Sequence, residues 1–279
     1  MLAICRLTIV ETLRRRLTLA LFATTILLIG LTGWAFAEIS RVSALQGVER
    51  FAQFATLLLF LLLLFTGMLA LTAVFTAAAA VAGELESGVA AALLARPLRR
   101  STYLFGKWLG LAVVIGAFSL VAGSGEIWIV SQVSGYAPPA PAAALALITA
   151  QALLLMTLSL ALATRLSAVT SAIIATVGFF LAWMLGTVDL MGVALRYPTL
   201  TTVGEVGKIL LPTNALWQAA EYYLEPPALL TLVHGLGLIA AGNPFMVLAP
   251  QSPAMLVWAG LWGLAVLGLG VLGLIRRAL

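Results

Sequence analysis

The sequence predicts an all-α membrane protein with six transmembrane helices. Of the 279 residues, 63% are hydrophobic and only 9% are charged, whereas soluble domains carry roughly 25% charged residues. The mean hydropathy is +1.14, and six apolar segments are long enough to cross a bilayer core that needs about 20 helical residues. Lipid is therefore the expected solvent for most of the chain.

Residues 1–16 are predicted to form an amphipathic helix. Leu2, Ile9, Val10 and Leu13 fall on one side at about 100° per residue. We expect this helix to lie in the membrane interface at the cytoplasmic face; a disordered basic leader is the alternative. The apolar run that follows is long for a secretory signal, so we interpret it as a first span rather than a cleaved segment.

The six predicted spans form one transmembrane domain over residues 1–279. They run approximately over residues 17–37, 54–82, 108–133, 143–164, 168–189 and 254–275. With the N-terminus inside, eleven Lys and Arg residues lie in cytoplasmic segments and four lie outside. This asymmetry favours an N-in/C-in, multi-pass topology in the inner (cytoplasmic) membrane, because positively charged loops stay on the cytoplasmic side.

Residues 190–253 are predicted to form an outer element before the last span. The stretch Leu211-Pro212-Thr213-Asn214 resembles a helix start with Thr213 or Asn214 as N-cap, and this helix would end near Glu225, before two prolines. The segment 228–241 is apolar but short. A seventh span there would place the C-terminal arginines outside, against the charge asymmetry. A re-entrant or interfacial segment is therefore expected.

The most informative segment lies between the second and third spans, at residues 84–107. Two acids precede a Ser87-Gly88 break, strong helix formers follow from Val89 to Ala95, and Pro97 ends the predicted short helix. An exposed apolar helix of this kind must bury its surface. It would do so on lipid, on its own bundle or in a groove of a partner.

This segment resembles the coupling region of ATP-binding-cassette (ABC) type-2 permeases. The shared pattern is Glu-x-Glu-x-Gly, then two leucines, then Pro-x-Arg-Arg, then a lysine. The resemblance extends over the whole chain, through the basic N-terminal helix, the six spans and the outer element. The Leu-Pro-Thr-Asn stretch and the overall size are most similar to the permease of the nitrous-oxide-reductase maturation transporter.

The resemblance implies that a cytoplasmic coupling helix after the second span docks in a cleft of a separate ATPase subunit. The residues that would carry this contact are Glu84, Glu86, Gly88, Leu93, Leu94, Pro97 and Arg100, flanked by Arg14, Arg15 and Arg16. The alternative interpretation is that these residues form only a solvated, positively charged loop.

The sequence contains no G-x-x-x-x-G-K-[ST] phosphate-binding loop, so we expect the chain not to be an enzyme and to bind no cofactor. By the resemblance, ATP and Mg²⁺ would bind to the partner ATPase. A second permease copy, in a homodimer or heterodimer, and membrane lipid are further expected partners, and an extracytoplasmic accessory protein is another candidate. The positive charges lie between apolar runs, which indicates topology rather than nucleic-acid binding.

Few other side chains suggest chemistry. Cys5 and His234 are the single cysteine and histidine, so no Cys/His metal site is expected. Glu126 is the one acid well inside a predicted span and is a candidate for the translocation path, with a structural role near the outer interface as the alternative. The acids expected to be solvated outer groups are Asp189, Glu205, Glu221 and Glu225.

The predicted function is the permease subunit of an ATP-driven transporter, with export as the expected direction. A secondary transporter is an alternative, but it would usually show inverted repeats and buried charges at the midplane. A non-transporting mechanotransmission or scaffold subunit is another, because it would use the same coupling helix. An intramembrane enzyme is disfavoured, since no H-E-x-x-H motif occurs and one histidine leaves little acid–base chemistry.

Overall fold

The computed structural model of the chain describes every residue except 43–47, 91–98, 226–246, 248 and 278–279. Over the described residues the regular structure is helical. The helices are α1 (Leu2–Arg14), α2 (Arg16–Val42), α3 (Val48–Glu86), α5 (Arg100–Ser134), α6 (Pro141–Ala163), α7 (Ala168–Leu195), α8 (Pro198–Leu210), α9 (Thr213–Leu224) and α12 (Pro253–Ile275).

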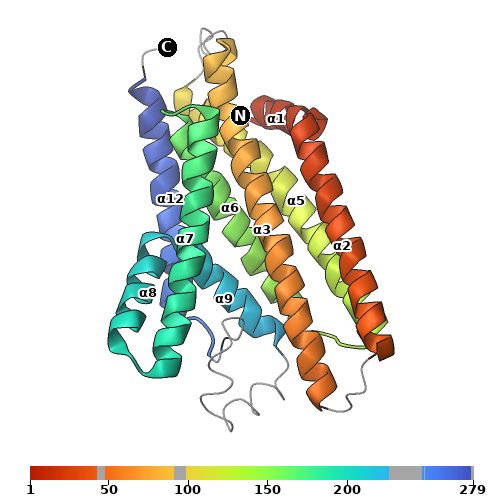
Figure 1. The fold of residues 1–279 in the computed structure, drawn as a ribbon. Helices are drawn as coiled ribbons and strands as arrows, with labels where there is room; N and C mark the ends of the chain where they lie inside the picture. Colours follow the sequence, from red (N-terminus) through yellow and green to blue (C-terminus); the bar gives the residue numbers. More distant parts are fainter. Residues whose placement is uncertain (43–47, 91–98, 226–246, 248, 278–279) are drawn as a thin grey trace.

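Six of the described helices, α2, α3, α5, α6, α7 and α12, are long and apolar enough to cross a membrane. This confirms the predicted all-α fold with six spans. Successive spans run in opposite directions, so both chain termini lie at the same end of the bundle (Figure 1). We call this the terminal end and the opposite one the distal end.

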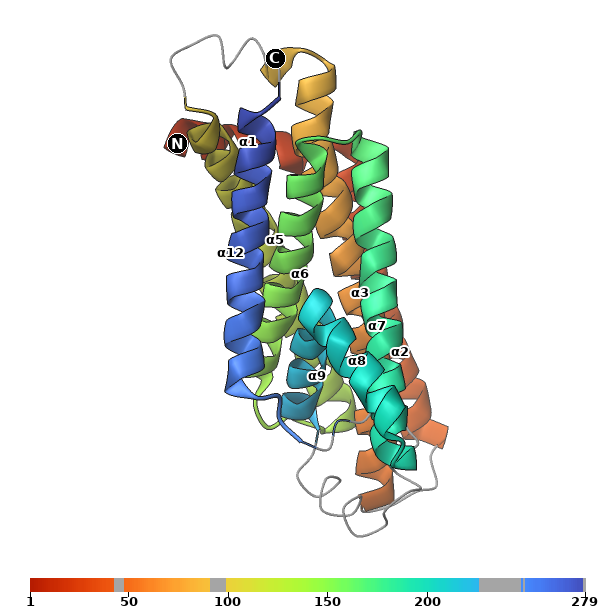
Figure 2. The same cartoon turned by 90° about the vertical axis from the view of Figure 1, so that its left-hand side faces the viewer.

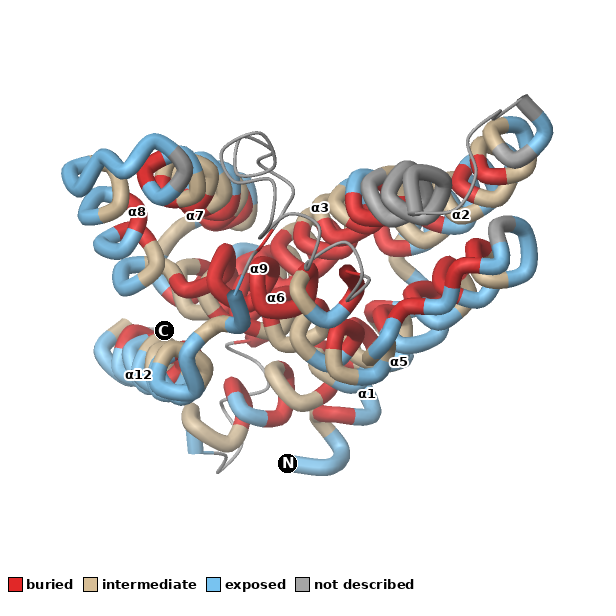
Figure 3. Tube along the Cα trace, turned by 90° about the horizontal axis from the view of Figure 1, so that it is seen from below, coloured by how far each residue is buried: buried red, intermediate tan, exposed pale blue. Residues whose placement is uncertain are grey.

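Helix α6 is the centre of the bundle. It packs against α3, α5, α7, α9 and α12, and a view along the bundle shows it surrounded by these neighbours (Figure 3). Two of its polar side chains bind neighbouring helices. Ser159 Oγ donates to the Val74 carbonyl oxygen of α3 at 2.7 Å, and Thr157 Oγ1 accepts from Trp108 Nε1 of α5 at 2.8 Å. Such pairing is required where no water can reach a polar group.

Helix α1 lies across the terminal end and packs against α5 (Figure 2). The side that faces the protein is small and polar, because the buried residues of α1 are Cys5, Thr8 and Thr12. The large apolar residues predicted for the lipid side remain exposed, among them Leu2 and Val10. This division fits the expected interfacial helix.

Two glycines of α5 allow α1 to approach closely. A Cβ added at Gly106 would lie 2.9 Å from Ile4 Cβ, and one at Gly110 would lie 2.8 Å from the Cys5 carbonyl oxygen. Both distances are shorter than real Cβ atoms tolerate. The small-xxx-small spacing of Gly106 and Gly110 therefore serves a helix contact inside this chain.

The outer element was predicted to begin at residue 190, but in the structure the preceding helix runs further. Helix α7 continues to Leu195, so residues 190–195 extend the fifth span. Helix α8 was not predicted; it begins with a proline at its first turn, a favourable position. At 1.5 Å per residue α8 is about 20 Å long, too short to cross a core of about 30 Å. It folds back against α7 in the distal half of the bundle, and the following helix α9 packs against α6 (Figure 2).

Helix α9 ends where the sequence predicted, next to Glu225, but its N-cap residue differs from the prediction. Pro212 is the N-cap, so the assignment to Thr213 or Asn214 was wrong. Asn214 lies inside the helix, where its amide packs against Gly186 of α7. The predicted re-entrant segment at 228–241 lies outside the described residues.

The contact of α1 with α5 can be tested through Cys5, the single cysteine, which is buried there. We expect Gly110→Ala to accelerate maleimide labelling of Cys5 by roughly tenfold, because overpacking a tight contact costs about 1–3 kcal/mol. Gly125→Ala is the matched control, since a Cβ at Gly125 meets no atom within 4 Å. Equal labelling rates in the two variants would show that the close approach does not hold α1 in place.

Candidate functional site

Lys107 is the centre of a buried group of charges at the terminal end. Its fully buried ammonium is ion-paired with Glu84 of α3 and, with Nζ 3.2 Å from Oε2, with Glu11 of α1. Tyr103, one turn earlier on α5, donates a hydrogen bond to Glu84 Oε2 at 2.6 Å. Glu11 is also ion-paired with Arg15. We call these five residues the terminal ion cluster.

The terminal ion cluster is electrically balanced, with two acids and two bases. Burial alone would favour the neutral form of Glu11, but the hydrogen bond from Arg15 and the charge of Lys107 outweigh it and hold the pKa of Glu11 below its ordinary value. A buried lysine is stable only when its charge is compensated and its hydrogen bonds are made. The cluster therefore ties α1, α3 and α5 together at one point.

The structure assigns two of the predicted ATPase-contact residues to internal contacts. Glu84 is only 7% exposed and is bound to Lys107 and Tyr103. Arg100 Nη1 donates to three carbonyl oxygens at the end of α12, those of Leu274, Ile275 and Arg277, at 2.9, 2.8 and 2.7 Å. The Leu274 and Ile275 carbonyls belong to the last turn of α12, where a helix lacks the backbone N–H partners of the next turn. Glu84 thus joins α3 to α5, and Arg100 joins α5 to the end of α12.

Other predicted contact residues are exposed. Glu86 ends α3, and its Oε1 accepts a hydrogen bond from the Ala168 backbone N–H at the start of α7, at 3.3 Å. Gly88 follows in the turn after α3 with a φ of 77°, in the left-handed region that favours glycine. These two residues remain predicted contacts.

The remaining predicted ATPase-contact residues are the arginines of the N-terminal helix region and the residues of the predicted coupling helix. Arg14 and Arg16 are exposed beside the terminal ion cluster, while Arg15 belongs to it. Most of the predicted short helix at 89–95 lies outside the described residues, because residues 91–98 are not described. Leu93, Leu94 and Pro97 belong to this stretch. Their role remains a prediction.

Glu126 of α5, the candidate for the translocation path, is fully buried against α2. Its Oε1 accepts a hydrogen bond from Thr32 Oγ1 at 3.4 Å, and its other oxygen has no partner among the described residues. The helices are close here, since a Cβ at Gly33 would lie 2.8 Å from Ile129 Cγ2. Glu126 thus lies in a helix–helix contact, and a role in translocation stays a prediction.

The acids of the outer element are not all solvated, contrary to expectation. Asp189 of α7 is buried and ion-paired with Lys208 of α8, and only Glu205 is exposed. Glu221 and Glu225 of α9 are 0% and 1% exposed. Sequence reasoning missed them because burial depends on which helices cover them.

A polar stripe along α9 was the available signal for this burial. Asn214, Gln218, Glu221 and Glu225 follow one another at four, three and four residues, and so fall on one helix face. Burial raises the pKa of Glu225 to about 8, although a hydrogen bond from the Val247 backbone N–H at 3.1 Å opposes the shift. Burial and the neighbouring Glu225 also raise the pKa of Glu221 well above its ordinary value.

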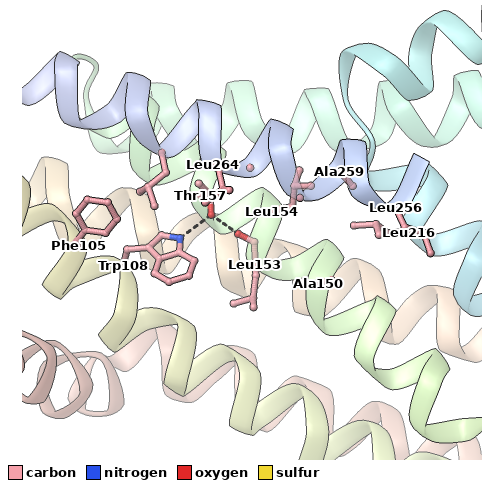
Figure 4. Close-up of a pocket in the computed structure, with 13 residues that line it drawn as sticks. Phe105, Trp108, Ala150, Leu153, Leu154, Thr157, Leu216, Leu256, Ala259 and Leu264 are labelled. Atoms are coloured by element: carbon pink, nitrogen blue, oxygen red, sulfur yellow. Dashed lines mark hydrogen bonds between the residues drawn. The ribbon is translucent and has the colours of Figure 1, made fainter. Parts of the chain in front are cut away.

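An apolar cavity of about 370 Å³ lies between α5, α6 and α12 (Figure 4). Its lining includes Phe105, Trp108, Leu154, Leu256 and Leu264. The hydrogen bond between Trp108 and Thr157 satisfies the polar atoms at its wall. The cavity offers no charged group for chemistry, and no group of three or more metal-ligating side chains occurs among the described residues.

Comparison with known protein families adds one finding. A family model described as ABC-2 family transporter protein matches residues 2–272, nearly the whole chain. No curated protein matches the sequence.

The terminal ion cluster predicts a strong effect of Lys107→Met on stability. Removing the lysine leaves the buried Glu84 without its counter-charge, and breaking a buried pair in this way costs about 3–5 kcal/mol. We expect a large drop in the unfolding temperature of the purified protein in detergent, partly restored by Lys107→Met with Glu84→Gln. The control is Arg41→Gln, because Arg41 pairs with Glu38 on the surface with a side chain 78% exposed. Equal losses for Lys107→Met and Arg41→Gln would contradict a central role for the cluster.

The buried acids predict a pH dependence of stability in the opposite sense to most carboxylates. Glu225 keeps its proton in the folded protein up to about pH 8 but loses it in the unfolded chain above its ordinary pKa of 4.5. Its contribution to stability therefore falls as the pH rises from 4.5 to 8. We expect Glu225→Gln to raise the unfolding temperature at pH 8 and to change it little at pH 4.5. The exposed acid variant Glu205→Gln should show no such difference; a Glu225→Gln profile parallel to that of the native protein would refute the assignment.

Proposed function

Because the chain belongs to the ABC-2 transporter family, we propose that it is the permease subunit of an ATP-driven exporter whose ATPase is a separate subunit. Family membership makes it a multi-pass membrane permease of an ABC transporter, with no phosphate-binding loop of its own. The separate ATPase, outward transport across the inner membrane and pairing with a second permease are the proposed additions.

The observation that carries the proposal is the position of the terminal ion cluster. It holds the end of α3 and the beginning of α5, the two helices that flank the predicted coupling helix. A force applied between them would act on both spans at once, and on α1 through Glu11. Such a rigid base is what a permease needs to convert movement of an attached ATPase into movement of its spans.

Further bonds extend this base to the other side of the bundle. Arg100 joins α5 to the end of α12, and Arg277 Nη1 donates to the Thr164 carbonyl oxygen at the end of α6 at 2.9 Å. The exposed Arg14, Arg16 and Arg99 lie at the same end. This positive charge supports the terminal end as the cytoplasmic side, where the ATPase would bind.

The proposal predicts that Gly88→Ala weakens binding of the ATPase. A side chain in the left-handed region costs roughly 1–2 kcal/mol, so the chain would leave α3 in another direction. We expect several-fold less ATPase to co-purify with the permease when it is co-expressed with an ABC ATPase encoded by a neighbouring gene. Gly83→Ala is the control, because Gly83 lies one turn earlier and a Cβ there meets no atom within 4 Å. Unchanged co-purification together with unchanged transport would overturn the proposal.

A further inference from the structure

A small polar hollow lies between α7 and α9 in the distal half of the bundle, and in this structure it is too narrow to hold a water molecule. Glu221 contributes the acid of this hollow and two tryptophans contribute aromatic surface. The side chains that line it include Trp183, Thr187, Asn214, Trp217, Gln218 and Glu221. It is separate from the terminal ion cluster and from the apolar cavity between α5, α6 and α12, since it shares no residue with either.

The polar groups of this hollow are not satisfied within the described chain. Both carboxyl oxygens of Glu221 and the Nδ2 atom of Asn214 are buried without a hydrogen-bond partner. Among the described residues the nearest base in the sequence, Lys208, already pairs with Asp189. Gln218 is occupied as well, because it donates to the Gly186 carbonyl oxygen at 3.4 Å and accepts from Gln251 at 2.8 Å. A buried carboxyl group left without a partner is costly, and functional sites are where proteins retain such a group.

The hollow lies at a seam of the bundle. Helix α8 packs mainly against α7, and α9 packs mainly against α6, whereas α8 and α9 barely touch. Gly204 and Gly207 bring α8 against Asp189 and Leu185 of α7. Movement of the α7–α8 pair relative to α6 and α9 would therefore open the hollow without breaking either tight contact.

We propose that this hollow, once α7 and α8 have moved away from α6 and α9, binds the cationic group of the transported molecule, an organic ammonium. A carboxylate supplies the counter-charge, and Trp183 and Trp217, which line the hollow, supply aromatic rings of the kind that bind ammonium groups favourably. The amide of Asn214 has capacity left for a further polar group of the same molecule. This substrate class rests on the proposed transport function and specifies it.

Protons compete with the cation for Glu221. Among the described residues, the titratable groups around it are Glu225 at the end of the same helix, Tyr136 beside Glu225, and the Asp189–Lys208 pair of α7 and α8. His234 lies outside the described residues. Helices α6 and α12 carry no titratable residue, and the charged side chains at the distal start of α3 lie outside the described part. A cation must displace the proton of Glu221, so its affinity should rise with pH by up to about tenfold per unit below the raised pKa.

The test compares choline with its uncharged isostere 3,3-dimethylbutan-1-ol. The full chain is purified in maltoside micelles, which carry no charge, and binding is followed by tryptophan fluorescence between pH 6 and pH 8. We expect choline to bind at least tenfold more tightly than the isostere, with affinity that increases with pH. Glu221→Gln should remove both the preference and the pH dependence, while Glu205→Gln, which changes an exposed acid of α8, should keep them.

Equal binding of the two ligands, or choline binding that Glu221→Gln leaves intact, would overturn the proposal. If Glu221→Gln fails to fold, Glu221→Asp provides the second variant, since it retains the charge on a shorter side chain and should bind choline more weakly with the pH dependence intact. The assay uses no ATPase. A failure of ATPase coupling would therefore leave this result unaffected, and a failure here would leave the coupling test unaffected.

Discussion

A lysine with no exposed surface in a bundle of apolar helices must find its counter-charges inside the protein, and the terminal end is organised around this requirement. Lys107 meets it with one acid from α3 and one from α1. Neither acid is its neighbour in the sequence, so the charges are compensated only when all three helices are in place. A partial assembly would leave an ion buried without compensation, at a cost of several kcal/mol. The same requirement that stabilises this end also makes it rigid.

In the distal half of the bundle, by contrast, two buried acids lack a counter-charge within the described part of the chain. There the buried acids Glu221 and Glu225 have no base beside them among the described residues. Their raised pKa values are the consequence, because a carboxyl group that cannot find a counter-charge becomes neutral by retaining its proton. One end of the protein therefore holds fixed, compensated charges and the other holds charges that can still change.

The sequence was sufficient for features that depend on local composition. Apolar length predicted the six spans, and two prolines predicted the end of α9. The pattern of acids, glycine and arginines led to the ABC-2 family, which the family match supports. The roles of Glu84 and Glu221 could not be predicted in this way, since both depend on contacts between helices distant in the chain. Glu84 reads as a surface acid because it follows an apolar span and precedes Glu86, yet only Glu86 is exposed.

Glu86 of α3 contacts the start of helix α7, and the distal hollow is lined by the other end of the same helix, so α7 connects the two ends. Glu86 accepts a hydrogen bond from the first residue of α7, beside the segment where the ATPase is proposed to bind. Helix α7 then runs without a break for 28 residues, about 42 Å at 1.5 Å per residue, and its distal part forms one wall of the hollow. The opposite wall belongs to α9, which is held by α6 instead. A displacement of α7 relative to α6 at the terminal end would therefore change the width of the hollow at the distal end. A continuous helix with different attachments at its two ends is a physical basis for coupling the two sites, because no flexible segment lies between them.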